Sequence, residues 1–305
     1  MSASLSHRAT VLRRTRAFLD SRGFTEVETP VLVPSPGLDV HLDAFEANAA
    51  AGAHGKFLIT SPEYQMKRLL AAGSERIYQI VRCFRRGESG ERHNPEFTML
   101  ELYRARAGMN DIIRDTEQLV AALSGGAFHV HGARMAALPP FRRMRVDEAF
   151  RAYAGIEQTE MLRLAEHDEE TFYRTLAFDV EPKLALLPEA VFLTHYPKVQ
   201  ASLARTDPED SRFAERFELY VAGVELCNGF GELTDAVEQR ARFEHDQAQR
   251  RVRNLPVYPI DEKFLAALPD MPPSGGNAIG LDRLVALLAG TTNIAAAIAF
   301  PDAAL

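Results

Sequence analysis

A short, strongly charged loop separates two segments that are predicted to be strands, residues 77–84 and 96–104. Arg85 stands at the end of the first strand, and Phe97 and Glu101 lie on the second. A guanidinium can bind an anionic phosphate chain, an aromatic ring can stack on a flat base, and a carboxylate can neutralise an ammonium group. The pattern therefore predicts a strand–loop–strand unit that binds a nucleotide together with an amine.

The second of these strands gathers several such groups on one side. Because successive side chains alternate between the two faces of a strand, Phe97, Met99, Glu101 and Tyr103 share a face. A carboxylate among aromatic side chains is costly to bury unless it is paired. The alternative interpretation is a solvated face that carries one acid, since antiparallel sheets often leave one face in water. The adjoining charged loop favours the ligand-binding interpretation.

Composition restricts the class of protein. The 305 residues carry a formal net charge of −7, and proteins that bind nucleic acid in general usually show a basic surface, so that class is not indicated. The two cysteines, Cys83 and Cys227, form no CxxC pair, which indicates neither a zinc site nor a disulfide framework. Residues 1–12 are polar and basic, unlike a signal peptide, and no apolar run approaches membrane-spanning length. We therefore expect a reduced, cytoplasmic protein with no membrane contact.

The pattern along the chain predicts one α+β domain, residues 1–305, with a largely antiparallel sheet flanked by helices. Further helices are predicted at residues 5–21, 61–72 (with Ser61 as the capping residue) and 235–251. Further extended segments are predicted at residues 24–33, 57–60 and 217–228, with a small-residue linker or hairpin tip at 47–55. The segment of about residues 107–190 is mostly helical in pattern and is interpreted as an insertion within the domain.

A hairpin is predicted to turn at residues 222–223. A two- or four-residue loop would pair Tyr220 with Glu225 and Glu218 with Cys227. Glu218 and Glu225 would then lie diagonally on one face, where two carboxylates can share a hard cation such as Mg²⁺. Two solvated edge glutamates are an equally weighted alternative on the residues alone.

Two glycine-rich segments follow. In residues 228–233 the glycines let the backbone approach a ligand closely and bring Glu232 near the same face. Residues 275–283 run from glycines into a helix with Arg283 in its first turn, and helix starts favour anions. Simple glycine-rich turns are the alternative for both segments.

Three segments resemble the motifs of the class II aminoacyl-tRNA synthetases, and they occur in the expected order. Residues 22–30 resemble motif 1, a helix and strand of the dimer interface; residues 84–101 resemble motif 2; and residues 276–283 resemble motif 3. Between them, residues 61–63, Glu218, Glu225 and residues 228–232 resemble the lysyl branch in particular. The resemblance covers nearly the whole chain and implies the class II catalytic fold and a homodimer.

The resemblance also implies roles for single residues. Arg85 and Arg283 would be the catalytic residues, with Arg85 on the α-phosphate and the substrate carboxylate, and Phe97 and Arg283 on either side of adenine. Further ATP contacts are implied for Arg86, Gly87, His93, Asn94, Glu225, Leu226 and Gly280. Mg²⁺ would be held by Glu218 and Glu225. The diamino-acid pocket would be formed by Ser61, Pro62, Glu63, Glu101, Tyr103, Asn228, Glu232 and Ala278.

Several departures from the lysyl pattern matter. The sequence begins at the motif 1 helix, so we expect no anticodon-binding OB-fold of the kind that precedes motif 1 in lysyl-tRNA synthetases. Cys227 and Ala278 stand where the lysyl pattern has glycine, so the shape of the pocket should differ from one built for α-lysine. Gly87 stands in place of the motif 2 glutamate, with Glu88 one position later, so that Glu88 or a backbone group would replace the usual contact with adenine.

These departures resemble the stand-alone paralogs of lysyl-tRNA synthetase that modify translation elongation factor P, the EpmA/PoxA/GenX family. That resemblance implies ATP-dependent activation of (R)-β-lysine and its transfer to the ε-amino group of a lysine on elongation factor P, with no role for tRNA. The alternatives are a truncated synthetase that charges tRNA, a non-catalytic regulatory paralog, and a small-molecule amide ligase on the same fold.

Overall fold

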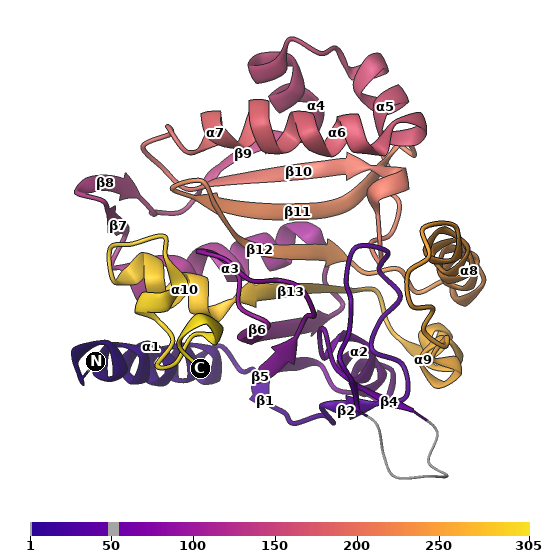
Figure 1. Ribbon diagram of the computed structural model, residues 1–305, viewed down its shortest axis with the longest axis horizontal. Helices are drawn as coiled ribbons and strands as arrows, with labels where there is room; N and C mark the ends of the chain where they lie inside the picture. Colours follow the sequence, from indigo (N-terminus) through magenta and orange to yellow (C-terminus); the bar gives the residue numbers. More distant parts are fainter. Residues whose placement is uncertain (1, 48–54) are drawn as a thin grey trace.

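The computed structural model describes residues 2–47 and 55–305. An eight-stranded sheet runs through this part of the chain (Figure 1), in the order β1-β5-β6-β13-β12-β11-β10-β9. In that order the strands span Thr25–Glu26, Arg76–Phe84, Glu96–Ala105, Ser274–Gly280, Val224–Gly231, Phe213–Val221, Val191–Pro197 and Arg142–Arg145. Only β1 with β5 and β9 with β10 pair in parallel among these neighbours. The expected largely antiparallel α+β architecture is confirmed.

One face of the sheet is covered by three helices, α1 (Ser2–Ser21), α3 (Met109–Ser124) and α10 (Leu281–Leu288). The buried residues of α3 recur at helical spacing and form an apolar stripe against the strands. Leu100 and Leu219 point into this core, while their strand neighbours Met99 and Glu218 line a cavity on the opposite face. The period-two alternation of β6 and β11 therefore divides core from cavity.

The β11–β12 hairpin turns at residues 222–223, as predicted. Tyr220 pairs with Glu225, as predicted, but Glu218 pairs with Asn228 rather than with Cys227. The register shifts by one residue between these pairs, which corrects the expected pairing of Glu218.

The shift comes from an extra residue in β12. Leu226 has no partner across the hairpin, and both Leu226 and Cys227 belong to the core. Glu225 and Asn228, three positions apart, can therefore both face the cavity together with Glu218. The shared face predicted for the two glutamates is kept by means of the bulge.

The segment of about residues 107–190 contains helices but also three short strands that were not predicted. Besides α3, its α-helices are α4 (Val146–Ala149), α5 (Gln158–His167), α6 (Glu169–Thr175) and α7 (Glu181–Leu184); one π-helical segment follows α4 and another joins α6 to α7. Its strands are β7 (Ala127–Val130), β8 (Ala133–Ala136) and β9, of which β9 extends the main sheet. Each strand has four residues, and the charged sequence of β9 hides any apolar alternation.

The N-terminal part follows the predicted order. Helix α1 is confirmed, and the extended residues 24–33 carry β1 at one end and β2 (Leu32–Val33) near the other. A small sheet joins β2, β4 (Lys56–Leu58) and β3 (Glu46–Ala47), and most of the predicted linker at 47–55 lies outside the described residues. Helix α2 (Glu63–Ala71) begins after Pro62, which takes the cap position expected for Ser61. The Ser61 hydroxyl still accepts a hydrogen bond from the backbone N–H of Glu63 at 3.1 Å.

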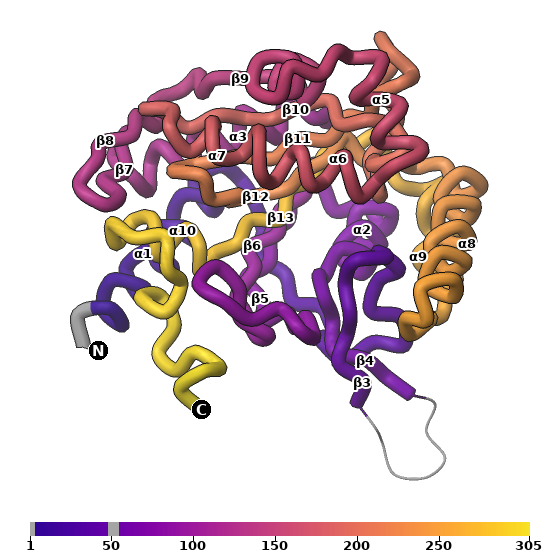
Figure 2. The backbone as a smooth tube through the Cα atoms, turned by 45° about the horizontal axis from the view of Figure 1, so that its top comes forward, coloured from indigo at the N-terminus to yellow at the C-terminus, as the bar shows by residue number. Residues whose placement is uncertain are grey.

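Two further helices, α8 (Ala236–Val252) and α9 (Glu262–Ala267), lie beside each other next to α2 (Figures 1 and 2). Asp235 caps α8 by accepting from the backbone N–H groups of Val237 and Glu238, at the start of the helix predicted for residues 235–251. No helix within the described ranges has the length and apolar character needed to cross a bilayer.

Candidate functional site

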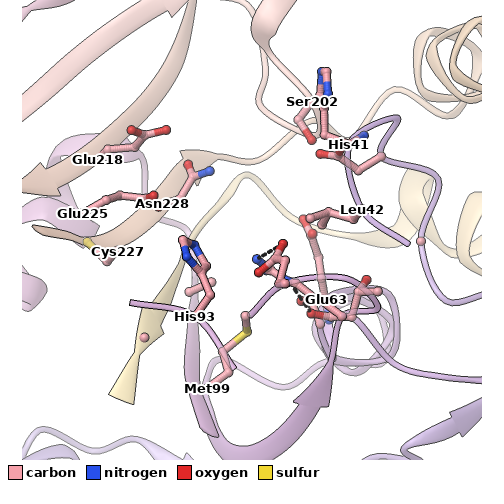
Figure 3. A pocket seen from close by; sticks show the side chains of 18 of the residues that line it. His41, Leu42, Glu63, His93, Met99, Ser202, Glu218, Glu225, Cys227 and Asn228 are labelled. Atoms are coloured by element: carbon pink, nitrogen blue, oxygen red, sulfur yellow. Dashed lines mark hydrogen bonds and ion pairs between the residues drawn. The ribbon is translucent and has the colours of Figure 1, made fainter. Parts of the chain in front are cut away.

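A cavity of about 1100 Å³ lies over the centre of the sheet, on the face opposite α3. Most of the predicted site residues line it: Ser61, Glu63, Arg85, His93, Asn94, Phe97, Glu218, Glu225, Leu226, Asn228, Ala278, Gly280 and Arg283. Figure 3 shows Glu218, Glu225 and Asn228 along one wall, with Glu63 across from them and His93 between. Segments far apart in sequence thus meet at one surface, as the motif pattern requires.

The remaining predicted residues do not line the cavity. Arg86 is turned away because its side chain binds Asp43 at 3.1 Å, and Gly87 is a turn residue with a φ of +86°. Pro62 caps α2. Glu101, Tyr103 and Glu232 are at most 3% exposed and lie behind the residues that face the cavity. These three therefore lie one layer behind the cavity surface, and their role in the diamino-acid pocket stays a prediction.

Cationic side chains converge at one end of the cavity. Arg283 Nη1 donates to the backbone carbonyl of Glu225 at 2.7 Å, and Arg283 Nη2 lies 2.8 Å from His93 Nε2. Burial and the charge of Arg283 lower the pKa of His93, so the imidazole is neutral and can accept from the guanidinium. The guanidinium of Arg85 lies 5.0 Å from the ring centroid of Phe97. A flat base and a phosphate chain would find a stacking ring and two guanidinium groups here.

The replacement of the motif 2 glutamate by Gly87 has a local structural explanation. Gly87 has a left-handed φ that favours glycine, so the backbone turns at that position. The next residue, Glu88, brings its carboxylate to the cavity wall and lies 3.7 Å from Arg85 Nη1. The structure therefore has a carboxylate at this wall, displaced by one position along the chain.

The two glutamates predicted to hold a metal differ in their protein partners. Glu218 accepts from Arg216 Nη2 at 2.6 Å and from the Tyr220 hydroxyl at 2.8 Å. The Glu225 side chain is 40% exposed, with only a 3.5 Å contact to Arg283. Its exposed part faces the cavity rather than the outer surface, so burial raises the pKa of Glu225, and the charge of Glu218 raises it further. Two carboxylates that repel one another favour a cation between them.

A layer of charged side chains lies behind the opposite wall. Glu101 accepts from the Ser61 hydroxyl at 2.7 Å and from the Tyr103 hydroxyl at 2.5 Å. The Lys67 ammonium lies 2.5 Å from Glu63 Oε1 and 2.5 Å from Glu232 Oε2. Lys67 was not among the predicted residues, although its position four residues after Glu63 on a helix is a recognisable pairing signal.

Burial is the main cause of the raised pKa values of the carboxyl groups in this layer. It raises the pKa of Glu101 to about 7, with the charge of Glu63 adding to the effect. It raises the pKa of Glu232 to about 8, against the opposing charge of Lys67. Asn228 Oδ1 is buried at the cavity wall and has no hydrogen-bond partner among the described residues. Buried carboxylates and an unpartnered acceptor suit a ligand that brings ammonium groups.

A segment that sequence reasoning missed walls the cavity on another side. Residues 35–39, 41 and 42 line it, and Arg250 of α8 binds this segment from the side away from the cavity. Arg250 is fully buried and binds the Asp43 carboxylate at 2.5 Å. It also donates to the backbone carbonyls of Asp39, Val40, Leu42 and Pro256. Arg250 appeared in the sequence only as one of several basic residues near a helix end, so no local pattern marked it.

Comparison with known proteins gives a consistent result. The family model of class II tRNA synthetases (D, K and N) matches residues 1–304. Among curated proteins, the elongation factor P–(R)-β-lysine ligase of Hamiltonella defensa is 41% identical, covering 98% of this chain and 95% of its own length. The protein of the same name from Proteus mirabilis is 42% identical with the same coverage. That of Haemophilus influenzae KW20 is 42% identical over 91% of this chain and 88% of its own.

Proposed function

The chain belongs to the class II tRNA synthetase family and, within it, to the elongation factor P–(R)-β-lysine ligases, and we propose that it activates (R)-β-lysine with ATP and transfers it to the ε-amino group of a lysine on elongation factor P. The observation that carries this proposal is the cavity itself. At one end it has Arg85, Arg283 and Phe97 for a nucleotide, and at the other it has Glu63 for an amine.

The first step is attack of the substrate carboxylate on the α-phosphorus of ATP. A carboxylate-oxygen-to-phosphorus bond forms, the bond to the β-phosphate bridge breaks, and pyrophosphate leaves. Arg85 and Arg283 are the cationic groups available to orient the two anionic reactants and to stabilise the charge that develops on phosphate oxygens. No nucleophile of the protein is required.

A magnesium ion is expected to bind together with ATP at the two carboxylates Glu218 and Glu225. Carboxylate oxygens suit this hard cation, and the raised pKa of Glu225 reflects negative charge that a cation would relieve. In the part of the chain that is described, no cluster of three or more potential ligand side chains forms a complete metal site. Phosphate oxygens and water would therefore supply the other ligands, as is usual for Mg²⁺.

In the second step the acceptor amine, in its neutral form, attacks the carbonyl carbon of the adenylate. An amide bond forms, the bond from the carbonyl carbon to the phosphate oxygen breaks, AMP leaves, and the proton of the amine passes to solvent. We place this reaction in the cytoplasm, with a homodimer formed through residues 22–30 and without tRNA. Sedimentation in solution tests the dimer independently of the chemistry.

ATP–pyrophosphate exchange with (R)-β-lysine and α-lysine side by side tests the proposed activity, followed by the intact mass of added elongation factor P. Exchange that favours (R)-β-lysine, with one β-lysyl mass increment on the factor, is expected. Exchange that favours α-lysine with label on tRNA would point instead to a tRNA-charging enzyme. No exchange with either would leave the regulatory and small-molecule ligase alternatives.

Replacing Glu88 by glutamine should weaken the binding of ATP but not that of the amino acid. A charge-assisted hydrogen bond contributes about 1.5–3 kcal/mol, so we expect the KM for ATP to rise about tenfold or more. The KM for (R)-β-lysine should change less than about twofold, because Glu88 lies beside Arg85, away from the Glu63 wall. Steady-state exchange at varied ATP concentration measures the effect. An unchanged KM for ATP would mean that a backbone group, and not Glu88, makes the contact with adenine.

Amino-acid binding should strengthen as pH rises from about 6.5 to 8.5. An ammonium binds an ionised carboxylate, and burial holds the pKa of Glu101 at about 7 and that of Glu232 at about 8. Raising the pH through these values ionises both groups, so the KM for (R)-β-lysine should fall by about fivefold or more. In the Glu232→Gln variant the part of the fall near pH 8 should disappear. A KM that rises with pH would contradict this assignment of the carboxylates.

A further inference from the structure

Lys67 lies in the layer behind the amino-acid wall without facing the cavity. It is 1% exposed, and its ammonium lies 2.5 Å from both Glu63 Oε1 and Glu232 Oε2. The rings of Tyr103 and Phe230 each have their centroid 6.0 Å from Nζ. An ammonium enclosed between two carboxylates and two aromatic rings is held in one place, unlike an exposed lysine.

The charge state of Lys67 follows from its neighbours. Burial alone would lower the pKa of Lys67, but the charges of Glu232 and Glu63 outweigh burial and raise it. The residue is therefore a permanent cation. The titratable groups that surround this cluster are Glu63 and Tyr64 from α2, Glu101 and Tyr103 from β6, Cys83 from β5, and Glu232 after β12.

The two oxygens of Glu63 have different surroundings. Oε1 accepts from Lys67, whereas Oε2 accepts no hydrogen bond from any described residue. The Glu63 side chain is 18% exposed and lines the cavity, while that of Glu232 is 1% exposed and does not. Lys67 thus fixes the rotation of the only member of this pair that a ligand can reach.

We propose that Lys67 is a positioning residue for the amino-acid substrate, whose ammonium binds Glu63 Oε1 and thereby presents Glu63 Oε2 to a substrate ammonium group. This role rests on the proposed function, since it requires that the cavity takes an amino acid with a second amine. Lys67 also lies 2.5 Å from Glu232 Oε2, so that one ammonium holds both side chains, of which only that of Glu63 faces the cavity.

The test compares two variants that share a neutral residue 232. Glu232→Gln leaves Lys67 paired with Glu63, and Lys67→Met/Glu232→Gln removes the cation together with its fully buried partner, so that only the partly exposed Glu63 loses its ammonium. Because a buried pair replaced by neutral side chains of similar size is often tolerated, the double variant should fold. Leu70→Ala on the same helix, 1% exposed and away from the carboxylates, controls for loosening of α2.

Each protein is assayed by ATP–pyrophosphate exchange over pH 6.5–8.5 and by calorimetric binding of (R)-β-lysine without ATP. Relative to Glu232→Gln, the double variant should raise the KM and the Kd for (R)-β-lysine about tenfold or more at pH 7.5, with the KM for ATP within about twofold. Its fall in KM should move to higher pH, because the charge of Lys67 lowers the pKa of Glu101 and its removal lets that pKa rise. Leu70→Ala should lower Tm but leave the KM and Kd for (R)-β-lysine and the pH dependence of this KM unchanged.

Equal KM, Kd and pH profiles in the two Glu232→Gln backgrounds would overturn the assignment and leave Lys67 as a structural ion pair. The assignment is also overturned if Leu70→Ala reproduces the shifts. If the wild-type protein neither binds (R)-β-lysine nor supports exchange, the proposed function fails, and the role of Lys67 fails with it. The wild-type measurements therefore separate the two failures.

Discussion

Replacing Arg85 by alanine is expected to reduce ATP–pyrophosphate exchange by about 10³-fold or more, because a positioned cation at a transferring phosphoryl group contributes that much. Arg85 is 23% exposed and lies at the cavity end where Phe97 and Glu88 also sit. Its own protein contacts are weak, at 3.5 Å to a backbone carbonyl and 3.7 Å to Glu88. Its loss should therefore change Tm little, since surface-type contacts contribute little to stability.

Arg82→Ala is the matched control for Arg85→Ala. Arg82 lies in β5, three residues before Arg85, which follows the end of that strand, and it carries the same charge, but it is half exposed and lies 3.6 Å from Glu96. Exchange should stay within about twofold of the wild type in this variant. Arg85→Lys should recover only part of the activity, because an ammonium cannot make the two parallel hydrogen bonds of a guanidinium. Exchange in Arg85→Ala within tenfold of the wild type would exclude Arg85 from the chemistry.

The parts of the fold that could be predicted are those in which the spacing of apolar residues within one strand or helix indicates the structure. The alternation of β6 places Phe97 and Met99 toward the cavity and Leu100 toward the core, as its sequence indicates. The strand-to-helix unit of β13 and α10 is marked by its glycines and by the change of period. Most of the candidate site lies on such units, so their motifs also predict which residues meet.

The features that could not be predicted depend on contacts between distant segments. The bulge at Leu226 breaks the period of β12, and only the packing of both Leu226 and Cys227 into the core shows why it is there. Arg250 reaches Asp43 across 207 positions of sequence. The depth of Glu101 and Glu232 behind the wall depends on how closely β13 approaches them, which no pattern within one segment can state.

That close approach makes Gly276 the second position where a large effect is expected. A Cβ at Gly276 would lie 2.2 Å from Tyr103 Cε1 and 2.4 Å from Glu232 Oε1. Both neighbours are at most 3% exposed and have little room to move. Gly276→Ala should therefore lower the free energy of unfolding by about 3 kcal/mol, near the upper end of overpacking costs. Displacement of Tyr103 would also break its 2.5 Å hydrogen bond to Glu101.

The activity of the Gly276→Ala variant should fall because it binds the amino acid more weakly. We expect the KM for (R)-β-lysine to rise about tenfold or more, with the KM for ATP nearly unchanged, because the displaced groups support Glu63 and not the nucleotide end. Gly90→Ala is the control, since a Cβ there meets nothing within 4 Å and its φ is not left-handed. Wild-type stability and KM in Gly276→Ala would mean that β13 can retreat from the carboxylate layer. The depth of that layer would then not depend on a glycine at this position.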